Sequence, residues 1–223
     1  MTKVAVVLSG CGVFDGAEIH EAVLTLLALD RAGAEVLCCA PDMPQMHVID
    51  HLRGEVAEGE SRNVLVESAR IARGEIADLA TVHASDVDAV IFPGGFGAAK
   101  NLSDFAVRGA EAKGHPEVLR LVTETVSAGK PLGFLCISPA VCATAFRGSG
   151  NQVALTVGDD AGTNEALAAM GARPVDRGVA EIEVDEERRI VSSPAYMLPV
   201  RIAEVAEGID KLVAKVLELS REA

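Results

Sequence analysis

Three short segments carry the residues of this chain that could do chemistry. Residues 9–16 are glycine-rich and follow an apolar run near the N-terminus, and residues 93–97 follow a second apolar run. Residues 133–140 contain a cysteine, Cys136, directly after a third run. In open parallel sheets, ligands bind beyond the carboxyl ends of the strands. We therefore look for the functional site at these three corners.

Cys136 is the candidate nucleophile. Leu135 still belongs to an apolar run and Pro139 suits the first turn of a helix, so the cysteine falls on a sharp turn between strand and helix. Such a nucleophile elbow exposes the head atom above the sheet, and the adjacent helix N-terminus favours the thiolate. We expect a depressed pKa for this thiol. On position alone, an ordinary buried thiol at a strand end explains Cys136 equally well.

Backbone N–H groups and one carboxyl are the candidate partners of this thiol. The corner that contains Gly94 and Gly95 leaves N–H groups without side-chain cover, as an oxyanion hole requires, and Ile137 offers a further N–H. A tight turn would explain the same glycines. Glu21 falls on the partly buried stripe of the first predicted helix, where its carboxyl could exchange a proton with the sulfur. The alternative is a helix carboxylate that reaches solvent.

Three further residues are possible supporting groups. Asp15 and Glu18 have the spacing of a capping box, so Glu18 is most simply a helix cap, and we expect His20 to face the surface or a loop. Cys11 follows the first strand, where it could approach Cys136 as an oxidation partner. A small loop residue is the simpler interpretation of Cys11.

The histidines argue against a hydrolase triad. All five precede Cys136 in the chain, whereas hydrolase-type and amidotransferase-type triads take their base from a later loop. The residue after Cys136 is Ile137, so no adjacent histidine base exists either. Hydrolysis of peptides or amides by this cysteine loses most of its support.

The pattern around these segments predicts an α/β fold. Buried apolar runs alternate with segments of helical period, which is typical of a parallel sheet covered on both faces. Strands are expected at residues 4–8, 35–40, 89–92, 131–135 and 153–156, with a β-hairpin over 182–191. Helices are expected at residues 17–32, 62–73, 116–128, 137–146, 163–170 and 199–219. Residues 41–61 form an irregular excursion, either a lid or a long surface loop.

Length and charge limit the possible partners. The 223 residues suit one large domain over residues 1–223, because no repeat or linker-like shift in composition divides them. A net charge of -13 repels phosphate backbones and anionic membrane surfaces, and an aromatic content of 3% leaves few rings for stacking on bases. We expect neither nucleic-acid nor membrane partners. The same shortage of rings suits a small, shallow site for a two- or three-carbon carbonyl.

The N-terminus and the cysteines predict a compartment. The N-terminal apolar run is too short for a secretory signal, and no window reaches the roughly 18 apolar residues of a membrane span. The five cysteines lack paired CxxC spacing and fit neither a disulfide framework nor a zinc site. We therefore predict a reducing cytoplasm as the location and no metal.

The motifs resemble a known family. Residues 8–24, residues 93–102, the segment around Cys136 and residues 193–197 are similar to the PfpI-like branch of the class I glutamine amidotransferase-like superfamily. Within that branch they are most similar to a subfamily named for isoprenoid biosynthesis, and the resemblance covers essentially the whole chain. It implies a flavodoxin-like three-layer sandwich with a mostly parallel sheet, and a homodimer.

The resemblance also implies an activity. It points to a cofactor-independent glyoxalase that turns glyoxal into glycolate without glutathione or metal, and related deglycases act on glycated thiols and amines. It carries over Cys136 as the nucleophile and Glu21, rather than Glu18, as the carboxylate that partners the thiol. Many relatives in the protease branch have a histidine directly after the nucleophile. Ile137 at that position puts peptidase activity in doubt.

Three hypotheses for function follow. In the leading one, Cys136 adds to a small aldehyde or dicarbonyl, Glu21 moves the protons, and no cofactor takes part. In the second, the protein is a thiol redox sensor or carbonyl-binding protein with incidental turnover. The third is dinucleotide binding after the first strand, but the spacing there is GxGxxxG rather than GxGxxG, and bulky Phe14 lies within it.

Overall fold

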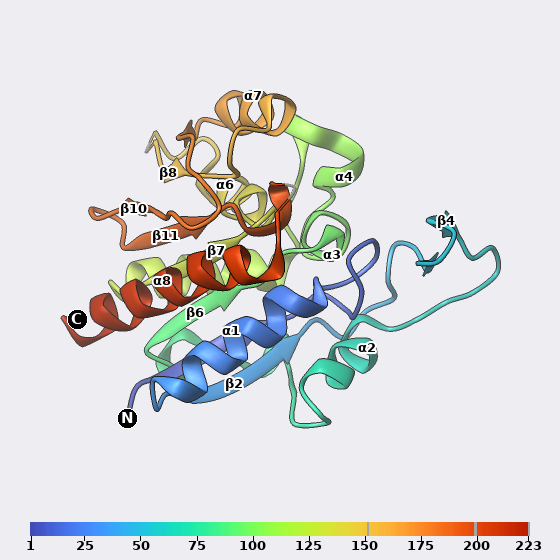
Figure 1. The fold of residues 1–223 in the computed structure, drawn as a ribbon, viewed down its shortest axis with the longest axis horizontal. Coiled ribbons are helices and arrows are strands. Elements are labelled where there is room, and N and C mark those ends of the chain that lie inside the picture. Colours follow the sequence, from blue (N-terminus) through green and yellow to red (C-terminus); the bar gives the residue numbers. More distant parts are fainter. Residues whose placement is uncertain (151, 199, 223) are drawn as a thin grey trace.

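A seven-stranded sheet forms the centre of the molecule, in the order β10-β11-β7-β6-β1-β2-β5 (Figure 1). The computed structural model describes residues 1–150, 152–198 and 200–222. In this sheet β10 pairs antiparallel with β11, and every other neighbouring pair is parallel. The predicted α/β sandwich with a mostly parallel sheet is confirmed. Its strands are β1 Lys3–Val7, β2 Glu35–Ala40, β5 Ala77–Asp78, β6 Ala89–Phe92, β7 Leu132–Leu135, β10 Glu183–Asp185 and β11 Ile190–Ser193.

The central strands are buried on both faces. Each residue of β6, β7 and β11 is buried, and so are the last four residues of β1. Phe92 and Phe134, paired in register on β6 and β7, stack with ring centroids 4.9 Å apart. Continuous apolar runs are the sequence signature of such doubly covered strands, because both side-chain directions meet helices.

Helices cover the sheet in two layers. α1 (Ile19–Arg31) and α8 (Ile202–Arg221) pack against each other on the face nearest the viewer in Figure 1. α5 (Pro116–Ser127) connects β6 to β7, in the direction opposite to the step from β1 to β2. Right-handed crossovers therefore place α1 and α5 on opposite faces. α5 packs against α6 (Pro139–Phe146), and both contact β7.

Shorter elements complete the fold. The remaining helices are α2 Val64–Ile71, α3 Phe96–Lys100, α4 Phe105–Arg108 and α7 Ala161–Ala169. The 3-10 turns are η1 Leu79–Thr81, η2 Ala84–Asp86, η3 Gly109–Glu111 and η4 Ala195–Met197. Two small sheets lie outside the main one: β3 (Ile49–Asp50) with β4 (Glu55–Val56), and β8 (Ala154–Leu155) with β9 (Arg173–Pro174).

Several predicted elements need correction. The strand expected at residues 153–156 does not join the main sheet, because β8 pairs only with β9 within the described residues. The helix expected from residue 137 begins at Pro139, since the turn of the elbow takes up residues 136–138. The helix expected at 199–219 has its first residue, Pro199, outside the described residues, and α8 begins at Ile202.

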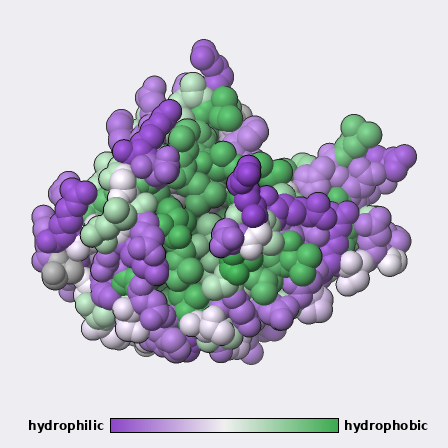
Figure 2. Space-filling model, turned by 90° about the horizontal axis from the view of Figure 1, so that it is seen from below, coloured by the Kyte–Doolittle hydropathy of each residue, from purple (hydrophilic) through white to green (hydrophobic). Residues whose placement is uncertain are grey.

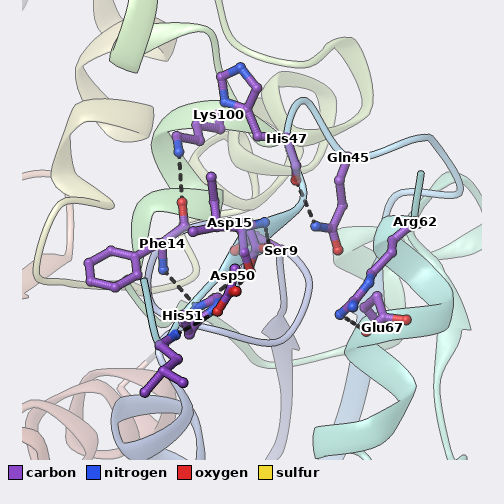
Figure 3. A network of polar contacts seen from close by, with 12 residues as sticks. Ser9, Phe14, Asp15, Gln45, His47, Asp50, His51, Arg62, Glu67 and Lys100 are labelled. Carbon is purple, nitrogen blue, oxygen red and sulfur yellow. Dashed lines mark hydrogen bonds and ion pairs between the residues drawn. The ribbon is translucent and has the colours of Figure 1, made fainter. Parts of the chain in front are cut away.

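The predicted excursion projects from the body as an arm (Figure 1). We call residues 41–63 the arm; they include β3 and β4. Within the arm, the Ile49 N–H donates to Asp15 Oδ2 at 2.7 Å, and the Phe14 N–H donates to His51 Nε2 at 3.2 Å (Figure 3). Asp15 therefore anchors the arm. The capping box predicted for Asp15 and Glu18 is wrong, because α1 begins only at Ile19, with Glu18 as its N-cap.

Apolar residues gather over one face of the molecule between polar borders (Figure 2). Three large apolar side chains on α1 reach the surface, and Ile19, Val23 and Leu27 are 38% to 47% exposed. Within the described residues, no helix is long and apolar enough to cross a membrane. The homodimer stays a prediction.

One substitution pair tests where the core lies. Leu121 on α5 is fully buried, whereas Leu52 in the arm is 94% exposed. Leu121→Ala should lower the free energy of unfolding by about 2–5 kcal/mol, because the buried cavity does not collapse completely. Leu52→Ala, the same chemical change, should stay within about 0.5 kcal/mol of the parent. Urea unfolding of both variants measures this, and equal losses would contradict the placement of Leu121 in the core.

Candidate active site

The three predicted corners meet at one edge of the sheet. β7, β6 and β1 are consecutive neighbours, so their carboxyl ends place the segments around Cys136, Gly94 and Ser9 side by side. A fourth corner follows β11, which pairs with β7, and it brings in Tyr196. This edge is the switch point where the chain reverses its direction along the sheet, as expected for a binding site.

Cys136 occupies a strained turn. Its φ is 58°, in the left-handed region that a non-glycine residue adopts only at a cost of about 1–3 kcal/mol. The Cys136 N–H donates to Ser193 O at 3.0 Å, which ties the turn to β11. The side chain is 8% exposed and lines a cavity. The predicted elbow is present in the structure.

Ser138, which was not predicted as a site residue, holds this elbow in place. Its hydroxyl donates to Phe92 O at 2.8 Å and accepts the Leu135 N–H at 2.8 Å, so it connects the ends of β6 and β7. The Ser138 N–H closes the turn on Leu135 O at 2.9 Å. The sequence signal that could have identified it is a serine directly before Pro139, at the end of an apolar run.

Glu21 reaches the same point from α1. Its side chain is completely buried, and Oε2 accepts the Gly94 N–H at 2.9 Å while Oε1 accepts the Tyr196 N–H at 3.2 Å. The carboxyl also forms a hydrogen bond with the Cys136 thiol. Burial, and then the charge of Glu18, raise the pKa of Glu21 to about 8. The carboxyl is therefore largely protonated at neutral pH.

The glycine corner divides its N–H groups between the two partners. The Gly94 N–H points to Glu21 and is therefore not free to bind an oxyanion, which corrects the role expected for it. The N–H groups of Gly95 and Ile137 donate to the Cys136 sulfur. A Cβ at Gly94 would collide with Cys136 and Glu21, and Gly95 has a φ of 93°, so both positions require glycine.

The surroundings of Cys136 do not favour the thiolate form of its side chain. Burial, and next the charge of Glu21, raise the pKa of Cys136 well above its ordinary value, while the N–H groups of Gly95 and Ile137 lower it. The depressed pKa expected from the helix N-terminus is wrong, because α6 starts three residues later and desolvation outweighs its field. The two groups titrate as a pair that holds one shared negative charge after its first ionisation.

Glu18 and His20 have the positions expected for them, as a helix cap and as an exposed side chain. Glu18 caps α1 by accepting the Glu21 N–H at 2.7 Å, and it lines the cavity. His20 is exposed, and its Nδ1 lies 3.0 Å from the Tyr196 hydroxyl. Cys11 is half-buried, and burial, followed by the charge of Glu67 on α2, raises the pKa of its thiol. Both Cys11 and Cys136 are free thiols, so no disulfide joins them.

A cavity of about 420 Å³ opens beside the Cys136 sulfur. It lies between the glycine corner, α3, α4, the start of α7 and η4, and the described arm residues do not line it. The arm is thus not a lid in this structure. The cavity is larger than the small, shallow site expected for a two- or three-carbon carbonyl. The described residues contain no cluster of three or more side chains suited to a metal ion.

Comparisons with known proteins identify relatives over the whole chain. A human protein, "Glutamine amidotransferase-like class 1 domain-containing protein 3, mitochondrial", is 52% identical over 98% of this chain and 83% of its own length. The rat "ES1 protein homolog, mitochondrial" is also 52% identical, over 98% and 84%. No family model matches the sequence.

Two solved structures are similar to this chain over nearly its whole length. An isoprenoid biosynthesis protein with an amidotransferase-like domain from Ehrlichia chaffeensis is 38% identical, with a TM-score of 0.90 over 97% of this chain and 99% of that one. DJ-1beta from Drosophila melanogaster shares the fold at 20% identity, with a TM-score of 0.55 over 100% of this chain and 97% of that one.

The predicted cytoplasmic location is wrong by this comparison. The human and rat relatives are named as mitochondrial proteins. Free cysteines argue against an oxidising compartment and do not distinguish one reducing compartment from another.

The raised pKa of Glu21 has a measurable effect on stability. Between the ordinary value of 4.5 and about 8, the unfolded state binds fewer protons than the folded state, so unfolding becomes easier as pH rises. Glu21→Gln lacks this titration. The variant should therefore gain stability relative to the parent from pH 5 to pH 8, by up to about 1.4 kcal/mol per pH unit. Urea unfolding at three pH values measures the trend.

In Glu21→Gln, the new amide faces a backbone N–H and can change the free energy of unfolding by an amount that does not depend on pH. Such a constant change would leave the predicted pH trend unaltered. Glu55→Gln changes an exposed carboxyl in the arm and serves as the control. A difference between Glu21→Gln and the parent that does not vary with pH would contradict the raised pKa.

Proposed function

Because this chain belongs to the family of glutamine amidotransferase-like class 1 domain proteins that includes the ES1 proteins, we propose that Cys136 and Glu21 form the catalytic pair of a cofactor-independent glyoxalase. Its substrate is glyoxal or a similar small dicarbonyl, and its product is the corresponding hydroxy acid. The observation that supports this most is the buried hydrogen bond between the Glu21 carboxyl and the Cys136 thiol beside a cavity.

Each part of the site has a task in this reaction. The pair loses one proton, and the Cys136 sulfur adds to the aldehyde carbon to form a hemithioacetal. Glu21 then takes the proton from that carbon, and the adjacent carbonyl oxygen is protonated, giving an enediol. Return of a proton to the second carbon yields the thioester of the hydroxy acid. The carbon skeleton is oxidised at one carbon and reduced at the next, so no external redox agent is required.

Hydrolysis completes the cycle. A water molecule attacks the thioester, the C–S bond breaks, and the hydroxy acid leaves while Cys136 regains its proton. The N–H groups of Gly95 and Ile137 lie at the sulfur, where they can stabilise the oxyanion of the hemithioacetal and of the tetrahedral intermediate. Gly94 and Tyr196 hold Glu21 in place through their own N–H groups.

The finer placement within the family is also a proposal. The motifs resemble those of ElbB, the enhancing-lycopene-biosynthesis protein, and the Ehrlichia structure at 38% identity carries an isoprenoid biosynthesis name. That name describes a pathway association rather than a reaction. We infer that the reaction is the carbonyl chemistry of the Cys136 and Glu21 pair.

Two variants and a pH profile test this function. Cys136→Ala and Glu21→Gln should each lower kcat/KM for glyoxal by at least about a hundredfold, because each removes a group that acts in the transition state. Cys11→Ser, a thiol outside the site, should retain the parent rate. The kcat/KM of the parent should rise with pH through an apparent pKa near 8. Parent-level turnover by both folded site variants would disprove the mechanism.

A thiol sensor or carbonyl-binding protein remains the alternative function. Sensor cysteines are usually accessible, with a low pKa and a resolving thiol nearby. Cys136 is buried, the pKa values of both the Cys136 and the Cys11 thiol are raised, and no disulfide joins the two residues, so these observations favour turnover. Mass spectrometry after mild peroxide separates the two: reversible, stoichiometric oxidation of Cys136 together with negligible kcat/KM would favour the sensor.

A further inference from the structure

The cavity beside Cys136 has much more room than glyoxal needs. Its volume of about 420 Å³ equals that of about 14 water molecules at roughly 30 Å³ each. Glyoxal has only four heavy atoms. The volume is within the range of about 300–1,000 Å³ typical of pockets that enclose larger organic ligands.

Much of the cavity wall is apolar. Val13, Phe96, Ala99, Phe105 and Met197 line the cavity from the first glycine-rich corner, α3, α4 and η4. Phe96 is 48% exposed, and Phe105 is half-buried. Exposed aromatic side chains at a cavity wall gain the most when a ligand covers them, since that contact removes apolar surface from water.

The charges around the cavity are of one sign. Its carboxylates are Glu18 and Asp160, and no lysine or arginine lines it among the described residues. Both carboxylates accept a backbone N–H as helix caps, from Glu21 at 2.7 Å and from Thr163 at 2.8 Å. The nearby Lys100 ammonium is bonded to Phe14 O at 2.7 Å. The described lining of the cavity thus includes carboxylates and no cation, while the Lys100 ammonium lies 5.6 Å from the centre of the Phe96 ring.

We propose that the preferred substrate is an α-oxoaldehyde that carries an uncharged apolar substituent, an aryl or a branched alkyl group. The aldehyde carbon meets the Cys136 sulfur, and the substituent lies against Phe96 and Phe105. This inference rests on the proposed glyoxalase function and goes beyond it by naming the substrate class. The reaction is unchanged: water is added overall, the aldehyde carbon becomes the carboxylate and the ketone carbon becomes the alcohol.

Three dicarbonyls of graded chemistry test the proposal. Phenylglyoxal carries an apolar ring, 4-carboxyphenylglyoxal carries the same ring with a negative charge, and glyoxal has no substituent. Initial rates of hydroxy-acid formation by the full chain give kcat/KM. Phenylglyoxal should exceed glyoxal by about tenfold or more, as expected for one well-filled apolar pocket. The carboxylated analogue should fall about tenfold or more below phenylglyoxal, because its charge meets carboxylates and no cation.

Matched variants locate the preference in the cavity wall. Phe105→Ala and Phe96→Ala should lower the ratio of kcat/KM for phenylglyoxal to that for glyoxal by about tenfold. Phe146→Ala is the control, since Phe146 is also half-buried at a helix end but does not line this cavity. Its ratio should match that of the parent. If Phe105→Ala does not fold, Phe96→Ala still gives the readout, because Phe96 is largely at the surface.

The outcomes separate the two proposals. If glyoxal is converted at least as well as phenylglyoxal, or if Phe96→Ala leaves the ratio unchanged, the substrate class is wrong while the glyoxalase function stands. If the folded parent converts none of the three dicarbonyls, both proposals are overturned. A strong preference for phenylglyoxal that Phe96→Ala abolishes and Phe146→Ala does not would support the inference.

Discussion

The site depends on a carboxyl group buried without a cation. Glu21 has no ion pair among the described residues, and its oxygens are satisfied by two backbone N–H groups and the thiol of Cys136. An ionised carboxylate in such surroundings is expensive, so the group retains a proton near neutral pH. In the proposed reaction, this carboxyl would therefore be able to accept and return protons near neutral pH beside a weakly acidic thiol.

The surrounding structure positions the groups that hold the buried Glu21 carboxyl and the Cys136 turn. Gly94 and Tyr196 provide the donors, and they come from corners after β6 and β11 that only the sheet order brings together. Ser138 fixes the ends of β6 and β7 to each other. Cys136 and Ala195 both have positive φ, 58° and 45°, so the corners after β7 and β11 carry backbone strain. Strain of this kind persists only where the surrounding packing determines the conformation.

Much of this arrangement could be predicted from the sequence. Apolar runs identified the main strands, and the glycine-rich corners after them located Cys136, Gly95 and Ile137, because strand ends are a local property. Tyr196 was not predicted as part of the site, since its contribution is a main-chain N–H from a corner distant in sequence. The pKa of Cys136 was predicted in the wrong direction, because a sequence motif does not reveal how deeply a turn is buried. The cavity also depends on residues from segments that are distant from one another in sequence.

The use of backbone donors has a consequence for how such a site diversifies. Ile137 contributes only its N–H to the sulfur, so its side chain is free of that task and faces the cavity instead. The residue after the nucleophile can therefore change without loss of the anion-binding donor. Within the superfamily, a histidine there would add a base and an isoleucine adds an apolar contact, while the scaffold of main-chain groups is retained. A shift from one reaction to another then requires few substitutions, and an alanine scan of this site would reveal only a small part of what holds it together.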